Sequence, residues 1–150
     1  MGKLKVTLED LFNIPGAVIY NPDSYKPLGH VEIDSRKVKN GSLFVAIKGE
    51  KFDGHNFVFD AVKKRAKAII INRNKLSKYN KLIIPIITVS DTIKAYGELA
   101  KIWRNKLSAD VISITGSNGK TTTKEIIATL LGEEHLVVKT EANNNNHIGV

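Results

Sequence analysis

The chain has 150 residues, of which 42% are hydrophobic and 25% are charged, with a formal net charge of +8 and no cysteine. This is the composition of a globular protein with one ordinary domain or two small ones, and it excludes a disulfide framework and a thiolate metal site. The longest mostly apolar run, residues 82–89, contains a proline and is far shorter than the roughly 20 residues that span a membrane. With no recognisable signal peptide, we expect a cytoplasmic protein without membrane contact.

Positive charge gathers between residues 61 and 90, which contain eight Lys or Arg residues and no Asp or Glu. Only Tyr79 supplies an aromatic ring there, and no groove-reading motif accompanies the charge. We interpret the segment as a solvated face and expect no nucleic-acid partner. Polynucleotide binding is the alternative.

Residues 1–89 are expected to form a small α/β domain. Thr7, with Asp10 three residues later, is typical of a helix N-cap, and Pro15 and Gly16 end that short helix. A second helix is expected at residues 56–65. Strands are expected at residues 17–19, 31–33, 43–47, 68–71 and 83–89. Pro85 in the last run indicates an edge strand or a bend.

Residues 90–150 are expected to begin a second domain with a parallel sheet. Ser90 or Asp91 can cap a helix, and the apolar residues of its expected core face are Ile93, Tyr96, Ala100, Trp103 and Leu107. A buried strand at 111–115, a helix at 120–131 and a strand at 136–138 should follow. This order opens a doubly wound α/β sheet.

Residues 116–121, Gly-Ser-Asn-Gly-Lys-Thr, lie between that strand and helix. Gly116 and Gly119 allow backbone amides to approach an anion, Lys120 can reach outer phosphates, and Thr121 offers a hydroxyl to Mg²⁺. The standard phosphate loop has glycine six residues before the lysine, where this chain has Ile114. An ordinary glycine-rich turn is the alternative interpretation.

Residues 111–125 resemble the shortened phosphate loop of the Mur ligase superfamily, which also includes folylpolyglutamate and cyanophycin synthetases. Residues 34–38, 41–50 and 53–57 are similar to the uridine-nucleotide-binding N-terminal domain of these enzymes. The resemblance implies a small α/β substrate-binding domain over 1–89 and, over 90–150, the start of the central ATP-binding domain.

The Asn-rich segment 143–150 looks most like that of the superfamily member that joins D-alanyl-D-alanine to UDP-N-acetylmuramoyl-tripeptide. The resemblance thus implies an ATP- and Mg²⁺-dependent ligase of peptidoglycan precursor synthesis, acting through an acyl phosphate. Lys120 would be catalytic and Thr121 a metal ligand. The implied nucleotide-binding residues are Gly116, Ser117, Asn118, Gly119, Lys120, Thr121 and Thr122, and the implied substrate-binding residues are Ser35, Arg36, Asn145 and Asn146.

Other interpretations stay open. Ser35 and Arg36 could equally be a turn serine and a surface arginine, and Asp53-Gly54-His55 could be a turn with a structural histidine. Family enzymes are about three times longer, and their acidic magnesium ligand, modified lysine, adenine site and amino-substrate domain have no counterpart here. We therefore expect an incomplete, monomeric N-terminal part that is inactive by itself. A stand-alone nucleotide-binding module and another Mur-type ligase are the alternatives.

Overall fold

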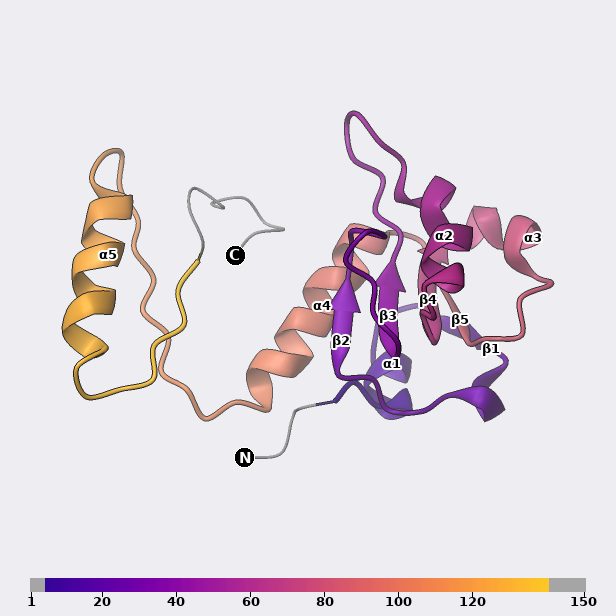
Figure 1. Cartoon of the computed structure of the whole chain (residues 1–150), viewed down its shortest axis with the longest axis horizontal. Coiled ribbons are helices and arrows are strands. Elements are labelled where there is room, and N and C mark those ends of the chain that lie inside the picture. Colours follow the sequence, from indigo (N-terminus) through magenta and orange to yellow (C-terminus); the bar gives the residue numbers. More distant parts are fainter. Residues whose placement is uncertain (1–4, 141–150) are drawn as a thin grey trace. The chain divides into compact units, whose positions relative to one another are not determined.

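The computed structural model of the chain describes residues 5–140. Its contacts divide it into two compact units, Met1–Leu107 and Ser108–Val150. Figure 1 labels the helices and strands of both units. None of the helices in the described part is long and apolar enough to cross a membrane.

The first unit contains five strands, four α-helices and three short 3₁₀ turns in its described residues. In chain order they are α1 (Leu8–Phe12), β1 (Val18–Tyr20), η1 (Pro22–Ser24), β2 (His30–Glu32), β3 (Ser42–Val45), η2 (Gly54–Phe57), α2 (Val58–Lys63), β4 (Ala68–Asn72), η3 (Arg73–Lys75), α3 (Leu76–Tyr79), β5 (Ile86–Val89) and α4 (Thr92–Asn105). The expected strands and helices of this part are thus present, with bounds shifted by a few residues.

The five strands form one sheet in the order β1-β5-β4-β3-β2. β2, β3, β4 and β5 run parallel, whereas β1 is antiparallel to β5. β5 is therefore an inner strand, and Pro85 lies just before it, where its carbonyl accepts a hydrogen bond from Ile69 N–H at 3.1 Å. The proline precedes the strand instead of marking an edge, and the mixed sheet confirms the α/β class.

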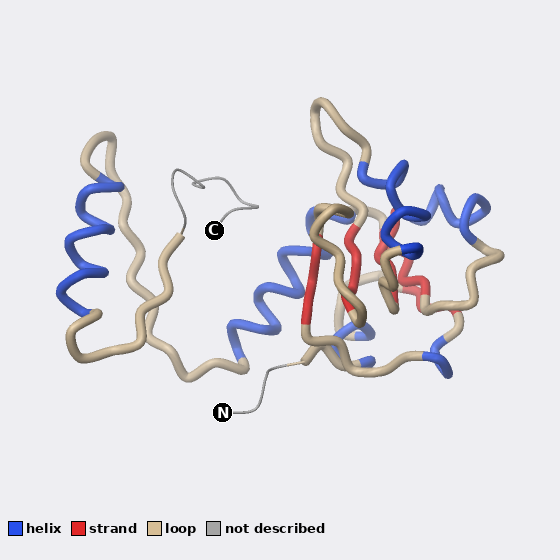
Figure 2. The backbone as a smooth tube through the Cα atoms, viewed as in Figure 1, coloured by secondary structure: helices blue, strands red, loops and turns tan. Residues whose placement is uncertain are grey.

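Helices cover both faces of the sheet, as Figure 2 shows. On one face, Leu11 of α1 and Leu99 of α4 join a core with alternate strand residues such as Ile70. On the other face, Ala61 of α2 and Tyr79 of α3 pack with the intervening strand residues. Strand side chains alternate between faces, and here both faces are covered, so the strands are apolar throughout.

Local capping explains where two helices begin. Thr7 accepts a hydrogen bond from Asp10 N–H at 3.2 Å, and the Asp10 carboxylate accepts one from Thr7 N–H at 2.7 Å. This reciprocal pair is a capping box and confirms Thr7 as the predicted N-cap of α1. Asp91, one of the two predicted caps, accepts from Ile93 and Lys94 N–H at the start of α4.

The core-facing stripe of α4 agrees with the prediction only in part: Tyr96 and Trp103 are half-buried and pack against the core. Ala95 and Leu99 are buried, whereas Ala100 is exposed and Leu107 is 39% exposed. Adjacent helix positions are about 100° apart, so a stripe shifted by one residue faces a different direction. The pattern was ambiguous because α4 carries apolar residues on both stripes.

The second unit contains one helix, α5 (Lys120–Leu131), among residues 108–140. The helix was predicted with these bounds. The strands expected at 111–115 and 136–138 are absent: both segments are irregular, and Val111 and Leu136 are 61% and 97% exposed. A strand needs a neighbour to satisfy its backbone groups, and residues 108–140 provide none.

The division between the units falls after Leu107. Helix α4 lies in the first unit because Ala95 and Leu99 contribute to its core. The sequence expectation placed the boundary after residue 89, before this helix. The last strand of the sheet ends there, so the expected boundary marks the end of the sheet but leaves out the helix that covers it.

Candidate nucleotide and substrate sites

Residues 116–119 form a tight turn that opens helix α5. Gly116 and Gly119 have φ angles of +146° and +78°, in a region that residues with a Cβ rarely adopt. Gly119 is the N-cap, and no side chain caps the helix. The Thr123 N–H donates to the Gly119 carbonyl at 2.9 Å. The amides before Thr123 lie outside the helix's own ladder, the arrangement that binds anions at helix N-termini.

The Lys120 side chain folds back over this turn. Its Nζ donates to the Gly116 carbonyl at 2.6 Å and lies 3.4 Å from the Ser117 carbonyl. Lys120 is half-buried, whereas Ser117 and Asn118 are exposed. The Lys120 ammonium group is thus held by backbone carbonyls at a solvent-accessible turn that precedes a helix N-terminus. Such a cation and helix N-terminus suit a polyanion such as a nucleotide's phosphates.

The segment after α5 is tied to the helix by two other lysines. Lys124 Nζ donates to the Thr140 carbonyl at 2.7 Å, and Lys139 pairs with Glu125. The hydrogen bond from Lys139 lowers the pKa of Glu125, against a smaller effect of burial. These two lysines hold the segment after the helix, whereas Lys120 contacts the glycine turn before it.

Ser35 and Arg36 belong to a turn that follows β2. Asp34 organises the turn: its carboxylate accepts from the Arg36 N–H at 2.9 Å and from the guanidinium at 2.8 to 3.2 Å. These hydrogen bonds lower the pKa of Asp34 to about 2. Lys64 Nζ donates to the Arg36 carbonyl at 3.1 Å. The Arg36 side chain is 85% exposed, so a fixed backbone presents a guanidinium with further donors to solvent.

This turn lies at the carboxyl edge of the parallel strands. Since β2, β3, β4 and β5 are parallel, the segments after them meet at that edge: 33–37, 46–54, 73–75 and 90–91. Ligands of open α/β sheets bind outside the carboxyl ends of the strands. Ser35 and Arg36 are therefore placed on the edge where a ligand is expected.

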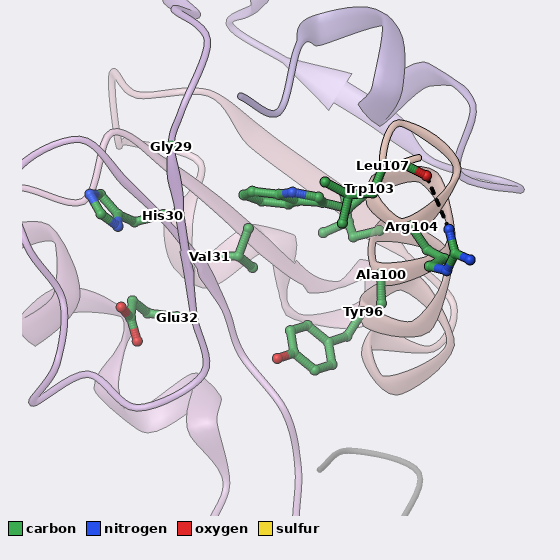
Figure 3. A pocket seen from close by; sticks show the side chains of 10 residues that line it. Gly29, His30, Val31, Glu32, Tyr96, Ala100, Trp103, Arg104 and Leu107 are labelled. Atoms are coloured by element: carbon green, nitrogen blue, oxygen red, sulfur yellow. Dashed lines mark hydrogen bonds between the residues drawn. The ribbon is translucent and has the colours of Figure 1, made fainter. Parts of the chain in front are cut away.

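A groove of about 440 Å³ lies elsewhere in the first unit, between β2 and α4. Figure 3 shows Val31 directed from β2 towards the side where Tyr96 and Trp103 project from α4. At one end, Arg104 donates to the Leu107 carbonyl at 3.1 Å. The groove contains none of the predicted site residues, and it includes four of the apolar residues that were expected to face the core. The groove is lined mostly by apolar side chains, and it lacks the convergent polar groups that are typical of a ligand site.

The structure places the predicted residues in two separate groups. Ser35 and Arg36 share one turn of the first unit, whereas residues 116–122 form the glycine turn and the start of α5 in the second. Asn145 and Asn146 lie outside the described residues. Within residues 5–140, no three His, Cys, Asp or Glu side chains gather as a metal site, so Thr121 as a magnesium ligand stays a prediction.

Two family models match the chain. The Mur ligase family catalytic-domain model matches residues 27–104, and the Mur ligase middle-domain model matches residues 114–150. The chain belongs to the Mur ligase family.

Within the family, the chain is similar to MurF, UDP-N-acetylmuramoyl-tripeptide–D-alanyl-D-alanine ligase. It is 38% identical to the Bacillus subtilis enzyme over 98% of this chain and 32% of that protein, and 38% identical to the Escherichia coli enzyme over 98% and 31%. The UDP-N-acetylmuramoyl-L-alanyl-D-glutamate–2,6-diaminopimelate ligase of Aquifex aeolicus is 42% identical over 78% of the chain. The predicted resemblance to the superfamily, and to this member, is confirmed.

Solved structures of MurF enzymes are also similar to this chain. MurF from Acinetobacter baumannii superposes with a TM-score of 0.85 at 31% identity, over 97% of this chain and 32% of that one. MurF from Thermotoga maritima in complex with ADP superposes with a TM-score of 0.66 at 35% identity, over 80% of this chain and 27% of that one. The chain thus spans about a third of the length of the relatives it matches.

Proposed function

We propose that the protein is an ATP-dependent ligase of peptidoglycan precursor synthesis that joins D-alanyl-D-alanine to UDP-N-acetylmuramoyl-tripeptide. The observation that carries this proposal is the glycine turn with Lys120 over it at the N-terminus of α5, in a chain that matches MurF over nearly its full length. Such a turn provides what the terminal phosphates of ATP require: backbone donors, a helix N-terminus and a cation.

The residues present fit ATP and Mg²⁺. Gly116 and Gly119 adopt positive φ angles and have no Cβ atom that could obstruct a phosphate, and the N-cap residue of α5, Gly119, has no side chain that could bond the first amides of the helix. The exposed Thr121 is the residue that would hold Mg²⁺. When bound, the ion neutralises charge on the phosphate oxygens and orients them.

In the proposed reaction, the terminal carboxylate of the tripeptide attacks the γ-phosphorus of ATP, which releases ADP and forms an acyl phosphate. The amine of D-alanyl-D-alanine then attacks the acyl carbon, expels phosphate and loses a proton as the peptide bond forms. Lys120 and the amides of residues 117–121 would stabilise charge on the transferred phosphoryl group. This is catalysis by positioning and electrostatics.

Substrate binding is proposed for the first unit. Ser35 and Arg36 would contact the uridine diphosphate end, because they lie at the carboxyl edge of the sheet and Arg36 presents donors suited to phosphate. Asn145 and Asn146 are proposed to bind the diphosphate and muramoyl part. We further propose a monomeric cytoplasmic enzyme whose action needs neither membrane nor nucleic acid.

The 42% identity to a diaminopimelate-adding ligase makes that reaction the second candidate. The protein encoded by the intact gene should be purified and given ATP, Mg²⁺ and either substrate pair, and products should be separated by chromatography. Pentapeptide formation with ADP release only from UDP-N-acetylmuramoyl-tripeptide and D-alanyl-D-alanine supports the proposal. Tripeptide formation from the dipeptide precursor and diaminopimelate would favour the second candidate, and no product from either pair would refute both.

A further inference from the structure

A compact hairpin-like loop follows β3 at the carboxyl edge of the sheet. Lys48 and Asp53 form an antiparallel bridge, Gly49 N–H donates to the Phe52 carbonyl at 2.9 Å, and Gly54 N–H donates to the Ile47 carbonyl at 2.8 Å. These bonds close residues 47–54 on themselves. The tip is solvent-exposed, and Phe52 is 72% exposed.

One buried histidine connects this loop to the sheet. His55 is 4% exposed, its Nδ1 lies 2.6 Å from Asp53 Oδ1, and its Nε2 lies 2.9 Å from the Asn72 amide nitrogen. A backbone N–H can only donate, so Nε2 is the acceptor and the ring proton resides on Nδ1 and is donated to Asp53. His55 is thus a neutral bridge between the base of the loop and the end of β4.

The partners of His55 are themselves fixed. Asn72 is the last residue of β4 and donates through its side chain to the Ser90 carbonyl after β5, at 2.8 Å. The buried Tyr79 hydroxyl donates to the His55 carbonyl at 2.5 Å. Burial disfavours a charged Asp53, but hydrogen bonds from His55 outweigh this effect and lower the pKa of Asp53. The imidazole therefore attaches the loop to the end of β4, and the Asn72 side chain joins that end to the segment after β5.

The loop tip carries chemistry suited to a nucleotide. Phe52 offers an exposed ring face, which can stack on a base, and the exposed Lys48 and Lys51 can approach a diphosphate. A flexible loop would have to be ordered when a ligand binds, at a cost in affinity. A loop already fixed at its base avoids most of that cost.

We infer that His55 is a positioning residue for the uridine diphosphate end of the substrate: it accepts the Asn72 N–H and so holds the loop 47–54 in a binding conformation. This inference rests on the proposed function. His55 touches no substrate in this role, and its effect should be confined to the affinity for the UDP-linked substrate.

The test compares three variants of the protein encoded by the intact gene. His55→Leu removes both hydrogen bonds, His55→Asn can retain a donor towards Asp53, and His55→Gln can place an amide oxygen where Nε2 accepts from Asn72. We expect His55→Leu and His55→Asn to raise KM for UDP-N-acetylmuramoyl-tripeptide about ten-fold or more, the effect of losing one buried hydrogen bond. His55→Gln should recover most of the affinity, and kcat and KM for ATP should stay unchanged.

Ile87→Val, a buried core substitution on β5, serves as the control for general destabilisation: its thermal midpoint should fall without a change in KM. Equal KM values for wild type and His55→Leu would overturn the inference and leave the ligase function standing. Parallel rises in KM for ATP, or equal defects in the Gln and Asn variants, would also overturn it. A wild-type protein that does not act on the UDP-linked substrate would refute the proposed function, and this inference with it.

Discussion

Lys106 Nζ lies 2.5 Å from Asp10 Oδ2, and this ion pair joins the end of helix α4 to the capping box of α1. Burial opposes ionisation of Asp10, yet the hydrogen bonds from Lys106 and Thr7 outweigh it and lower the pKa of Asp10. The last turn of α4 is thereby fixed to the first helix of the chain.

The two partners should contribute unequally to stability. Lys106→Met removes one partly exposed ion pair and should lower the free energy of unfolding by at most about 1 kcal/mol. Asp10→Ala also leaves the Thr7 N–H without its acceptor and should cost about 1–2 kcal/mol. Chemical denaturation of both variants measures the difference. A larger loss for Lys106→Met than for Asp10→Ala would contradict this account of the contact.

Gly54 should tolerate no side chain. A Cβ there would lie 2.7 Å from the carbonyl oxygen of Ile47 and 2.8 Å from its nitrogen, so Gly54→Ala must displace backbone and should destabilise the protein by about 1–3 kcal/mol. Gly97→Ala is the matched control, because Gly97 lies inside α4 with nothing within 4 Å of a Cβ. It should stabilise the protein by about 0.5–1 kcal/mol. Thermal unfolding of the pair should show shifts of opposite sign.

The turn at Asp34 should resist acid. Because the folded pKa of Asp34 is about 2, below the ordinary value of 3.8, the stabilisation of the turn is fully present above about pH 4 and is lost as the pH falls through about 2. An NMR titration of the Asp34 carboxyl carbon should give a midpoint near 2. Arg36→Gln should move it towards 3.8. A wild-type midpoint already near 3.8 would show that the Arg36 contact does not persist in solution.

Arg36 should also matter for substrate. If its guanidinium meets the diphosphate, Arg36→Gln should weaken binding of the UDP-linked substrate about ten-fold, as expected for a lost charge-assisted hydrogen bond. Lys37→Gln removes a neighbouring exposed cation and should have little effect. Calorimetry measures both dissociation constants. Equal effects of the two variants would reduce the role of Arg36 to general attraction.

The sequence predicts best those features that depend on a few adjacent residues. Thr7 and Asp91 cap helices as expected, and α5 begins after Gly119 and ends before Gly132. The apolar runs of the first unit form strands because both faces of the sheet are covered. Helix capping and chain reversal depend on the side chains of one or a few adjacent residues, so they can be predicted without knowledge of tertiary contacts.

Features that depend on distant contacts were missed. Residues 111–115 have the composition of a buried strand, but a strand forms only beside another, and none lies in residues 108–140. His55 was interpreted as a structural histidine in a turn, and it is buried. Its bond to Asn72, 17 residues away, has no sequence signature. The Asp-Gly-His sequence indicated a turn, which is present, but not what the imidazole contacts.

The turn with Lys120 is the proposed binding site for the terminal phosphates of ATP. Lys120→Met should abolish measurable ATP binding by the intact protein in the presence of Mg²⁺, because it removes the cation that lies over the glycine turn. Lys139→Met, which removes an exposed lysine of the same unit, is the control.

Calorimetric titration of Mg²⁺-ATP into the three proteins is the most direct measurement. Saturable binding is expected for the wild type and for Lys139→Met, and no binding for Lys120→Met. Equal affinity of all three proteins for ATP would contradict the proposed site, because the phosphates would then be held somewhere other than the glycine turn.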